Sequence, residues 1–313
     1  MSEQKNIGVE EVSYRLALTN ELSWRLIAYA GTEDWFESMA AILHLRPSSV
    51  HASVSIRFVP SLRPRLRFPS WQNLSAFFGT PCGFNKTWDY EELGRVTLWH
   101  NAQDTEIICE LDLYQASAFD FVLMWDSMHA LYRGLVRRGG LPLHSALVKR
   151  PEGAGTLLVG GSGVGKSTCC QRLPQHWSAL ADDGVLVVPV PQGGYTAHPL
   201  PTWSDHILQR PTLPCFVERG IPLSSIIFLE QAAKDEILPL GKGTAAVWLT
   251  QSARVICDRG RIQSPHAEGG DFNRFLFENA CEVVKSVPTF ILRVARDGRF
   301  WEELERGIPL QVT

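Results

Sequence analysis

The sequence predicts an α/β protein in which a larger domain with a mixed sheet follows a smaller α/β module. Three observations support this fold class. Short apolar runs with strand-like alternation are interspersed with segments of helical spacing. A glycine-rich loop stands between an apolar run at 156–159 and a helix-compatible segment at 167–173. The 313 residues, 45% of them hydrophobic, suffice for two domains, which we expect at 1–138 and 139–313.

Composition and charge restrict the classes of partner. The net charge is −3 and the pI is near 6.3, so we expect no broad basic surface for nucleic acid or an anionic membrane. The N-terminus is polar, and no uncharged stretch approaches the length of a membrane span. The seven cysteines lack metal-ligand spacing, which predicts free thiols. The sequence therefore predicts a soluble, cytoplasmic protein with no nucleic-acid and no membrane partner.

The first module has the pattern of a small α/β unit. The pattern predicts a helix at 35–43 and strands at 12–18, 24–29, 53–59, 95–100 and 105–113. Its side chains form no recognisable catalytic group, so we interpret it as a scaffold or partner-recognition module. A strongly apolar helix at 116–138, ended by Gly139-Gly140, is expected to link it to the second domain.

The second domain is expected to begin with a strand at 141–148 that carries His144. Pro174 limits the helix after the glycine-rich loop to about two turns. Residues 191–221 are predicted to be irregular and to face a substrate. The remaining pattern predicts strands at 177–181, 185–190, 223–230 and 289–295 and helices at 243–252, 271–287 and 300–306.

The glycine-rich loop fits the phosphate-binding pattern G-x-x-x-x-G-K-[ST] at Gly160, Gly165, Lys166 and Ser167. Backbone N–H groups cradle phosphate oxygens there, and the following helix N-terminus adds positive potential. Lys166 is expected to reach the β- and γ-phosphates and Ser167 to bind Mg²⁺, whereas the alternative is a glycine-rich turn. The predicted ATP-binding residues are Gly160, Gly161, Ser162, Gly163, Val164, Gly165, Lys166, Ser167 and Thr168.

A second signal is the acidic pair Asp182-Asp183, which follows Lys166 after one short predicted helix. Two adjacent carboxylates at a strand end can divide the work beside Mg²⁺–ATP. One holds the metal or its water, and the other accepts a proton from an attacking hydroxyl. The alternative is a simple Asp-Asp-Gly turn.

The order and spacing of His144, the phosphate loop and Ala181-Asp-Asp183 resemble the HPr kinase/phosphorylase family. That family is similar in its nucleotide site to ATP-dependent phosphoenolpyruvate carboxykinases. The chain more closely resembles the HPr-kinase-related proteins encoded beside radical-SAM peptide-maturation enzymes, above all the SynChlorMet cassette protein C family. The segments that carry this closer resemblance are Leu141-Pro-Leu-His144, Arg172-Leu-Pro174, Ala181-Asp-Asp183 and His198-Pro-Leu-Pro-Thr-Trp-Ser204.

The resemblance implies an HPr-kinase-like fold and an ATP- and Mg²⁺-dependent kinase that phosphorylates a serine or threonine hydroxyl of a peptide or small protein. It implies that Asp182 is the general base and that Asp183, with Ser167, is linked to the metal. It places His144 beside the phosphates, where it orients the carboxylates. It also implies association with radical-SAM peptide-modifying enzymes; a homo-oligomer stays an open alternative.

The chain departs from the HPr kinase pattern downstream. The family's Glu-x-Arg-Gly signature is one residue short here, at Glu218-Arg219-Gly220, which puts a second metal ligand and the reverse reaction in doubt. Arg210 or Arg219 is a candidate for charge neutralisation, and His198 for substrate binding or a structural role. Two other functions stay open: a nucleotide-binding accessory protein of a peptide-modifying complex, and a kinase of small hydroxylated molecules. The sequence does not choose ATP over GTP.

Overall fold

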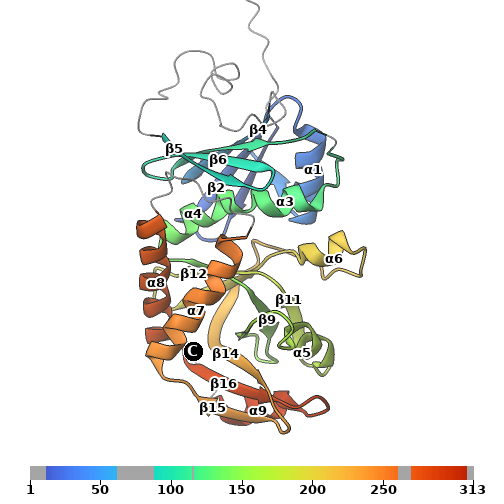
Figure 1. Ribbon diagram of the computed structural model, residues 1–313, viewed down its shortest axis with the longest axis vertical. Helices are drawn as coiled ribbons and strands as arrows, with labels where there is room; N and C mark the ends of the chain where they lie inside the picture. Colours follow the sequence, from blue (N-terminus) through green and yellow to red (C-terminus); the bar gives the residue numbers. More distant parts are fainter. Residues whose placement is uncertain (1–11, 62–87, 115, 260–268, 309–313) are drawn as a thin grey trace, which may run out of the picture.

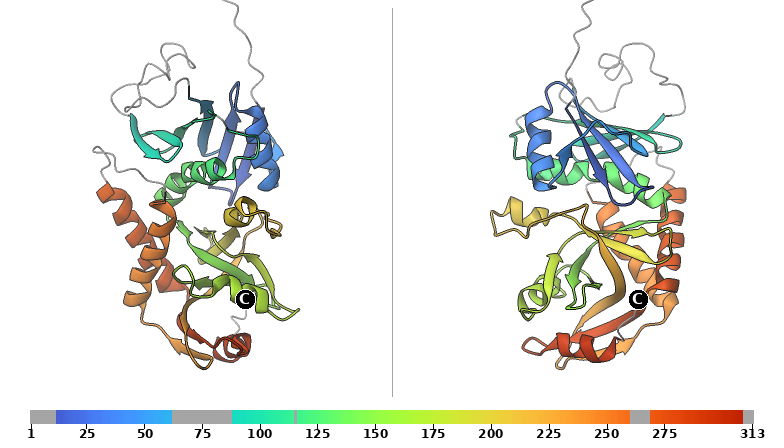
Figure 2. Two further views of the ribbon diagram at one scale, coloured as in Figure 1. Left: turned by 45° about the vertical axis from the view of Figure 1, so that its right-hand side comes forward. Right: turned by 180° about the vertical axis from the view of Figure 1, so that it is seen from behind.

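The computed structural model describes residues 12–61, 88–114, 116–259 and 269–308. These residues form two mixed β-sheets with helices between and beside them, which confirms the expected mixed α/β class. Figure 1 shows the first sheet at the top and the second sheet below it. Figure 2 shows from two further sides that a layer of helices, drawn in green, lies between the two sheets.

The first sheet has the strand order β3-β1-β2-β4-β7-β6-β5. Strand β4 pairs in parallel with both β2 and β7, and the outer pairs are antiparallel. Alternation sets the inner face, since Val54, Ile56 and Phe58 of β4 are buried. The elements are β1 Val12–Ala17, β2 Ser23–Ala28, α1 Glu33–Ile42, β3 Arg46–Pro47, β4 Val54–Pro60, β5 Trp88–Leu93, β6 Val96–Asn101 and β7 Glu106–Leu111.

The segment predicted as one linking helix at 116–138 forms two helices, α3 (Phe121–Ser127) and α4 (His129–Arg137). The first helix begins later than predicted because the Asp120 carboxylate accepts the Leu123 backbone N–H at 3.1 Å and caps it. The chain then turns at Met128, where a short 3₁₀-type hydrogen bond to Trp125 replaces the α-helical pattern. Gly139 ends α4 in the left-handed region, at φ +80°.

The second sheet has the strand order β11-β9-β10-β14-β13-β12-β8, and β16 and β15 extend it beside β14. Helix α5 packs on β9 and β11, whereas α7 and α8 pack on each other and on β8. The elements are β8 Leu141–Leu143, β9 Ser145–Lys149, β10 Gly155–Val159, α5 Lys166–Arg172, β11 Ser178–Ala181, β12 Val185–Pro189, β13 Tyr195–Pro199, α6 Trp203–Ile207, β14 Ile221–Gln231, β15 Glu236–Pro239, α7 Lys242–Cys257, α8 Gly269–Ser286, β16 Thr289–Val294 and α9 Phe300–Gly307.

At two places in the second sheet, consecutive strands of the chain pair with different neighbours: between β8 and β9, and between β11 and β12. We call these two places together the seam. Strand β8 pairs with β12, but its direct continuation β9 pairs with β10 and β11. Likewise β11 pairs with β9, while the next strand, β12, pairs with β8 and β13. The breaks fall at His144 and at 182–184, so the strand predicted at 141–148 is two strands. The seam therefore brings His144 and the acidic pair together.

The segment predicted to be irregular at 191–221 contains strand β13 and the short helix α6. The strand forms because Ala197 and His198 are both buried, on opposite faces of the sheet, while the backbone completes the sheet between β12 and β14. Helices α5 and α9 match their predictions closely, and α7 is longer than predicted. Throughout the described ranges, no helix combines the length and apolar character needed to cross a membrane.

Candidate functional site

The glycine-rich loop connects β10 to α5 and has the backbone of an anion-binding nest. Gly163 and Gly165 adopt left-handed conformations, at φ +78° and +115°, which residues with a Cβ atom rarely adopt. A Cβ atom added to either would meet no heavy atom within 4 Å, so the space above the loop is open for a ligand. In contrast, the side chain of Val164 packs against Gly160, where an added Cβ atom would overlap it. The residues present fit a bound phosphate chain.

Lys166 is buried at the head of α5 and folds back over the loop. Its Nζ donates to the carbonyl oxygens of Gly160 (2.8 Å) and Gly161 (3.2 Å) and lies 2.9 Å from Nε2 of His144. Burial lowers the pKa of Lys166, and the charges of Asp183 and Asp182 oppose that shift. The ammonium group is thus held where the loop begins, close to both carboxylates.

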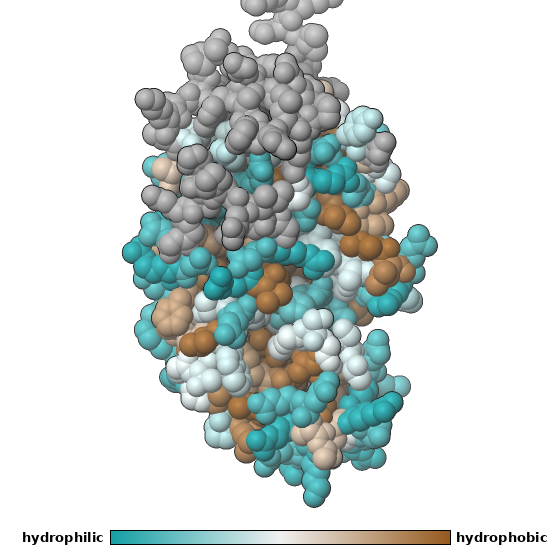
Figure 3. All heavy atoms as spheres, in the orientation of Figure 1, coloured by the Kyte–Doolittle hydropathy of each residue, from teal (hydrophilic) through white to brown (hydrophobic). Residues whose placement is uncertain are grey.

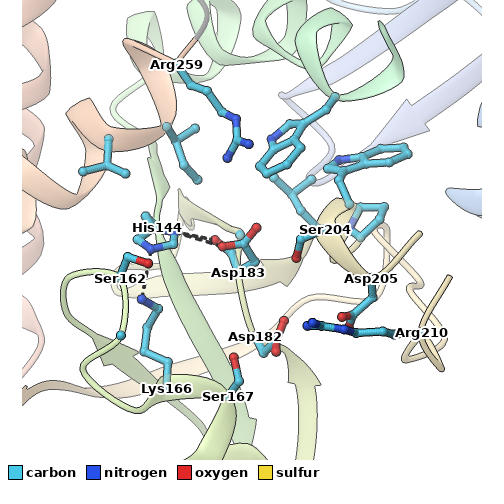
Figure 4. A pocket seen from close by; sticks show the side chains of 18 of the residues that line it. His144, Ser162, Lys166, Ser167, Asp182, Asp183, Ser204, Asp205, Arg210 and Arg259 are labelled. Carbon is cyan, nitrogen blue, oxygen red and sulfur yellow. Dashed lines mark hydrogen bonds and ion pairs between the residues drawn. The ribbon is translucent and has the colours of Figure 1, made fainter. Parts of the chain in front are cut away.

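His144 connects Lys166 to Asp183. The ammonium group of Lys166 can only donate, so Nε2 of His144 accepts and Nδ1 carries the proton. Nδ1 lies 3.1 Å from Oδ1 of Asp183 and 3.1 Å from its backbone carbonyl oxygen (Figure 4). Burial alone raises the pKa of Asp183, but the hydrogen bond from His144 and the charges of Arg259 and Lys166 outweigh burial and lower it.

Asp182, the other carboxylate of the acidic pair, lies beside the Ser167 hydroxyl in Figure 4. Its Oδ1 accepts a hydrogen bond of 2.7 Å from the hydroxyl of Thr202, in the turn before α6. Asp182 and Asp183 therefore have different partners, a hydroxyl for the first and an imidazole for the second. Because their partners differ, the two carboxylates can have different chemical roles.

These residues surround a cavity of about 790 Å³. Trp125 of α3 and Tyr132 of α4 form its roof, so the helices between the two sheets contribute to its wall. Arg259 places its guanidinium 3.1 Å above the ring of Trp125 and points into the cavity (Figure 4). Burial lowers the pKa of Arg259, and Asp183 and Asp126 oppose that shift. Arg210 enters from the opposite wall.

The cavity brings together the side chains that the sequence predicted as catalytic or metal-binding, and most of the loop. The predicted residues that line it are His144, Ser162, Gly163, Gly165, Lys166, Ser167, Thr168, Asp182 and Asp183. Gly160 and Gly161 line a neighbouring apolar cavity of about 560 Å³, which shares His144 and Ser162 with the first. Sequence reasoning missed Trp125, Tyr132 and Arg259, because no motif marks them.

Three other sequence candidates lie outside the described wall of this cavity. His198 is buried, with Nδ1 2.9 Å from the Val217 carbonyl oxygen; burial lowers the pKa of His198. Glu218 accepts the backbone N–H of Ala17 at 2.8 Å and so joins the second domain to β1. The Arg219 guanidinium stacks on Phe216, 4.3 Å from the ring centre. Their contacts are structural.

The oxygen donors at the site suit a hard cation. Ser167, Asp182 and Asp183 present a hydroxyl and two carboxylates beside the loop. Mg²⁺ is usually held by one or two carboxylates together with substrate phosphates and water, so this donor set fits it. Across the described ranges, no group of three or more His, Cys, Asp or Glu side chains is placed to hold a metal ion by itself.

Comparison with known proteins gives one family. The model of the family described as "SynChlorMet cassette protein ScmC" matches residues 107–309. No curated protein matches the chain. The matched range begins within β7 and includes every residue that lines the cavity, the roof residues Trp125 and Tyr132 among them.

Proposed function

We propose that this chain, which belongs to the SynChlorMet cassette protein ScmC family, is an ATP- and Mg²⁺-dependent kinase. Its acceptor would be a serine or threonine hydroxyl of a peptide or small protein. One observation carries the proposal: Lys166, His144 and Asp183 form a continuous polar chain at the head of an anion-binding loop, with Asp182 beside it. Loop, lysine and paired carboxylates are the parts that phosphoryl transfer requires.

The loop would bind the phosphates through the backbone N–H groups around Gly163 and Gly165. Lys166 would exchange a loop carbonyl for the β- and γ-phosphate oxygens, since its Nζ is held at the carbonyl oxygens of Gly160 and Gly161 in the same loop. Ser167 and Asp183 would hold Mg²⁺, which neutralises charge on the phosphates when it is bound. A nucleotide site of the HPr-kinase and phosphoenolpyruvate-carboxykinase kind is part of this proposal.

The contacts of the two carboxylates favour different roles. Asp183 is kept ionised by His144, Arg259 and Lys166, and its lowered pKa makes it a poor proton acceptor but a good metal ligand. Asp182 would take the proton of the acceptor hydroxyl as that oxygen bonds to the γ-phosphorus. The bond between the γ-phosphorus and the bridging oxygen breaks, and ADP leaves. Arg259 and Arg210 would neutralise charge on the transferred group.

Two substitutions test this proposal with γ-labelled ATP, a candidate peptide and calorimetric titration of ATP. Lys166→Ala should abolish turnover and weaken ATP binding. Asp182→Asn should keep ATP affinity but lower the transfer rate by a factor of about 10²–10⁴, the usual contribution of a general base. Glu302→Gln is the control, because its side chain is 46% exposed on α9 and does not line the cavity. Normal transfer by Asp182→Asn would show that the base is assigned wrongly.

The same experiment separates the kinase from an accessory role. Because the family is named for a cassette, we propose that the chain works beside peptide-modifying enzymes in the cytoplasm. ATP binding without transfer to any peptide would favour a regulatory or delivery role in such a complex. Transfer to free serine but not to peptides would favour a small-molecule kinase.

A further inference from the structure

Exposed apolar side chains gather on two segments that meet beside the cavity. Large exposed apolar residues are normally scattered singly over a surface. Here several lie on α3 with its N-terminal approach and on α6 with the chain after it, and α3 and α6 are in contact. Figure 3 shows apolar surface at the right-hand edge, at the level where Figure 1 labels these helices. We call this set the α3–α6 patch: Phe119 (63% exposed), Val122 (48%), Ile207 (38%), Leu208 (56%) and Leu213 (39%).

A row of aromatic rings joins the patch to the cavity. The ring of Phe119 lies 6.2 Å from that of Phe121, which lies 5.1 Å from the ring of His206. The His206 ring in turn lies 5.8 Å from Trp203, whose side chain lines the cavity. The patch is therefore continuous with the cavity wall.

The same two segments contribute side chains to the wall of the cavity. Trp125 comes from α3, and Ser204, Asp205 and Arg210 come from α6 and the chain after it. Asp205 and Arg210 carry opposite charges, so the α6 side of this wall offers no net charge to select an acidic or basic ligand. Recognition outside the cavity then depends on apolar contact.

We propose that the α3–α6 patch binds the acceptor as a polypeptide segment, with apolar side chains that flank the phosphorylated residue. The inference rests on the proposed function and names its substrate class. The segment from Trp203 to Arg210 contributes side chains to the cavity and also carries the exposed Ile207 and Leu208, so a chain whose hydroxyl lies at Asp182 can leave the cavity along this segment and continue over the patch. A free hydroxy amino acid or sugar ends inside the cavity and gains nothing from apolar surface beyond it.

The test is selection from a pool of synthetic decapeptides with a fixed central serine and randomised flanks. The immobilised full-length protein captures peptides with and without ADP, and mass spectrometry identifies them. Enrichment of Leu, Ile, Val or Phe in the flanks is expected. Absence of such enrichment under both conditions overturns the proposal.

Matched variants locate the binding surface. The double variant Val122→Ser/Leu208→Ser should weaken capture of the enriched peptides about tenfold, since two side chains lose their apolar contact. The control Val247→Ser/Phe277→Ser changes apolar residues of similar exposure on α7 and α8 and should leave capture unchanged. Equal capture by both double variants would place the peptide elsewhere and overturn the proposal.

Nucleotide binding is measured separately, so the two proposals can fail independently. Both double variants should bind ADP with wild-type affinity, because the patch lies outside the cavity. A wild-type protein that binds no ADP but still enriches apolar peptides contradicts the kinase and supports the patch. A protein that binds ADP and phosphorylates free serine, with no peptide enrichment, leaves the kinase in place and removes the patch.

Discussion

Asp104→Ala is expected to lower the free energy of unfolding by about 3 kcal/mol. Asp104 is only 1% exposed and lies in the turn between β6 and β7. Its carboxylate accepts from Nε of Arg133 (2.9 Å) and Nε of Arg137 (2.6 Å), both on α4, and lies 3.1 Å from Nδ1 of His100. Asp104 thus fastens the first sheet to the helix that carries the roof residue Tyr132.

The magnitude follows from what each partner retains. Removing one member of a buried ion pair costs about 3–5 kcal/mol, because the other charge stays buried without compensation. Arg133 keeps a second carboxylate partner, Glu91, and Arg137 is 37% exposed, so water replaces part of its lost interaction. Both facts place the loss at the lower end of the range. Asp104→Asn should lose about half as much, because asparagine accepts one hydrogen bond and tolerates the φ of +51°.

Urea unfolding followed by tryptophan fluorescence measures these losses at pH 7. The control is Glu106→Ala, whose carboxylate lies 3.6 Å from Arg57 in an exposed ion pair, with an expected change within about 0.5 kcal/mol. A loss below about 1 kcal/mol for Asp104→Ala, or equal losses for Asp104→Ala and Glu106→Ala, would refute the reasoning.

The difference in the free energy of unfolding between wild type and the Asp104 variants should also depend on pH, and its direction can be predicted. Burial opposes ionisation, but the hydrogen bond from His100 and the charges of Arg133 and Arg137 hold the pKa of Asp104 well below its usual range. The folded pKa is below the unfolded value of about 3.9, so the stabilisation is present above about pH 4 and is lost as the pH falls through the folded pKa. The gap between wild type and Asp104→Asn should therefore shrink below about pH 4.

Three further substitutions test other parts of the structure. Gly165→Ala, at φ +115°, should weaken ADP binding at least about tenfold in calorimetry, whereas Gly153→Ala, similarly strained at φ +97° but outside the loop, should not change it. Burial raises the pKa of Asp126 to about 6, so ionisation of Asp126 costs stability at high pH. Asp126→Asn should accordingly be more stable than wild type at pH 8 by at most about 3 kcal/mol, with no advantage below about pH 4; lower stability at pH 8 contradicts this. Gly220→Ala should destabilise the fold by about 1–3 kcal/mol in urea, because the new methyl group would overlap the His198 ring, and an unchanged midpoint would argue against that packing.

The sequence predicted those parts of the site that are encoded within one short stretch. The phosphate loop and the acidic pair have local spacing, and the seam between β8 and β9 places His144 beside them. The roof could not be predicted in the same way. Trp125, Tyr132 and Arg259 are far from the loop in sequence. The packing of α3 and α4 between the sheets brings Trp125 and Tyr132 to the cavity, and Arg259 reaches it from the chain that follows α7.

The prediction of secondary structure was wrong where tertiary contacts override the local sequence pattern. Residues 195–199 contain a histidine and a terminal proline, yet they complete the sheet between β12 and β14. The single strand expected at 141–148 is divided because its two halves pair with different neighbours. Glu218-Arg219-Gly220 is one residue short of the family signature, and the side chains of Glu218 and Arg219 contact β1 and Phe216.

The roof of the cavity comes from α3 and α4, which precede the loop-bearing sheet in the chain, and this limits how the protein can be divided. Asn279 of α8 donates to the backbone carbonyls of Val136 and Gly140, and the apolar face of α4 continues into the same core as β8 and β12. A fragment that begins at residue 139 would keep the glycine-rich loop and both aspartates. It would lose α3 and α4, and that core would be exposed to water. The loop-bearing half could therefore not be grafted onto another recognition domain by itself. Any such chimera would have to include α3 and α4.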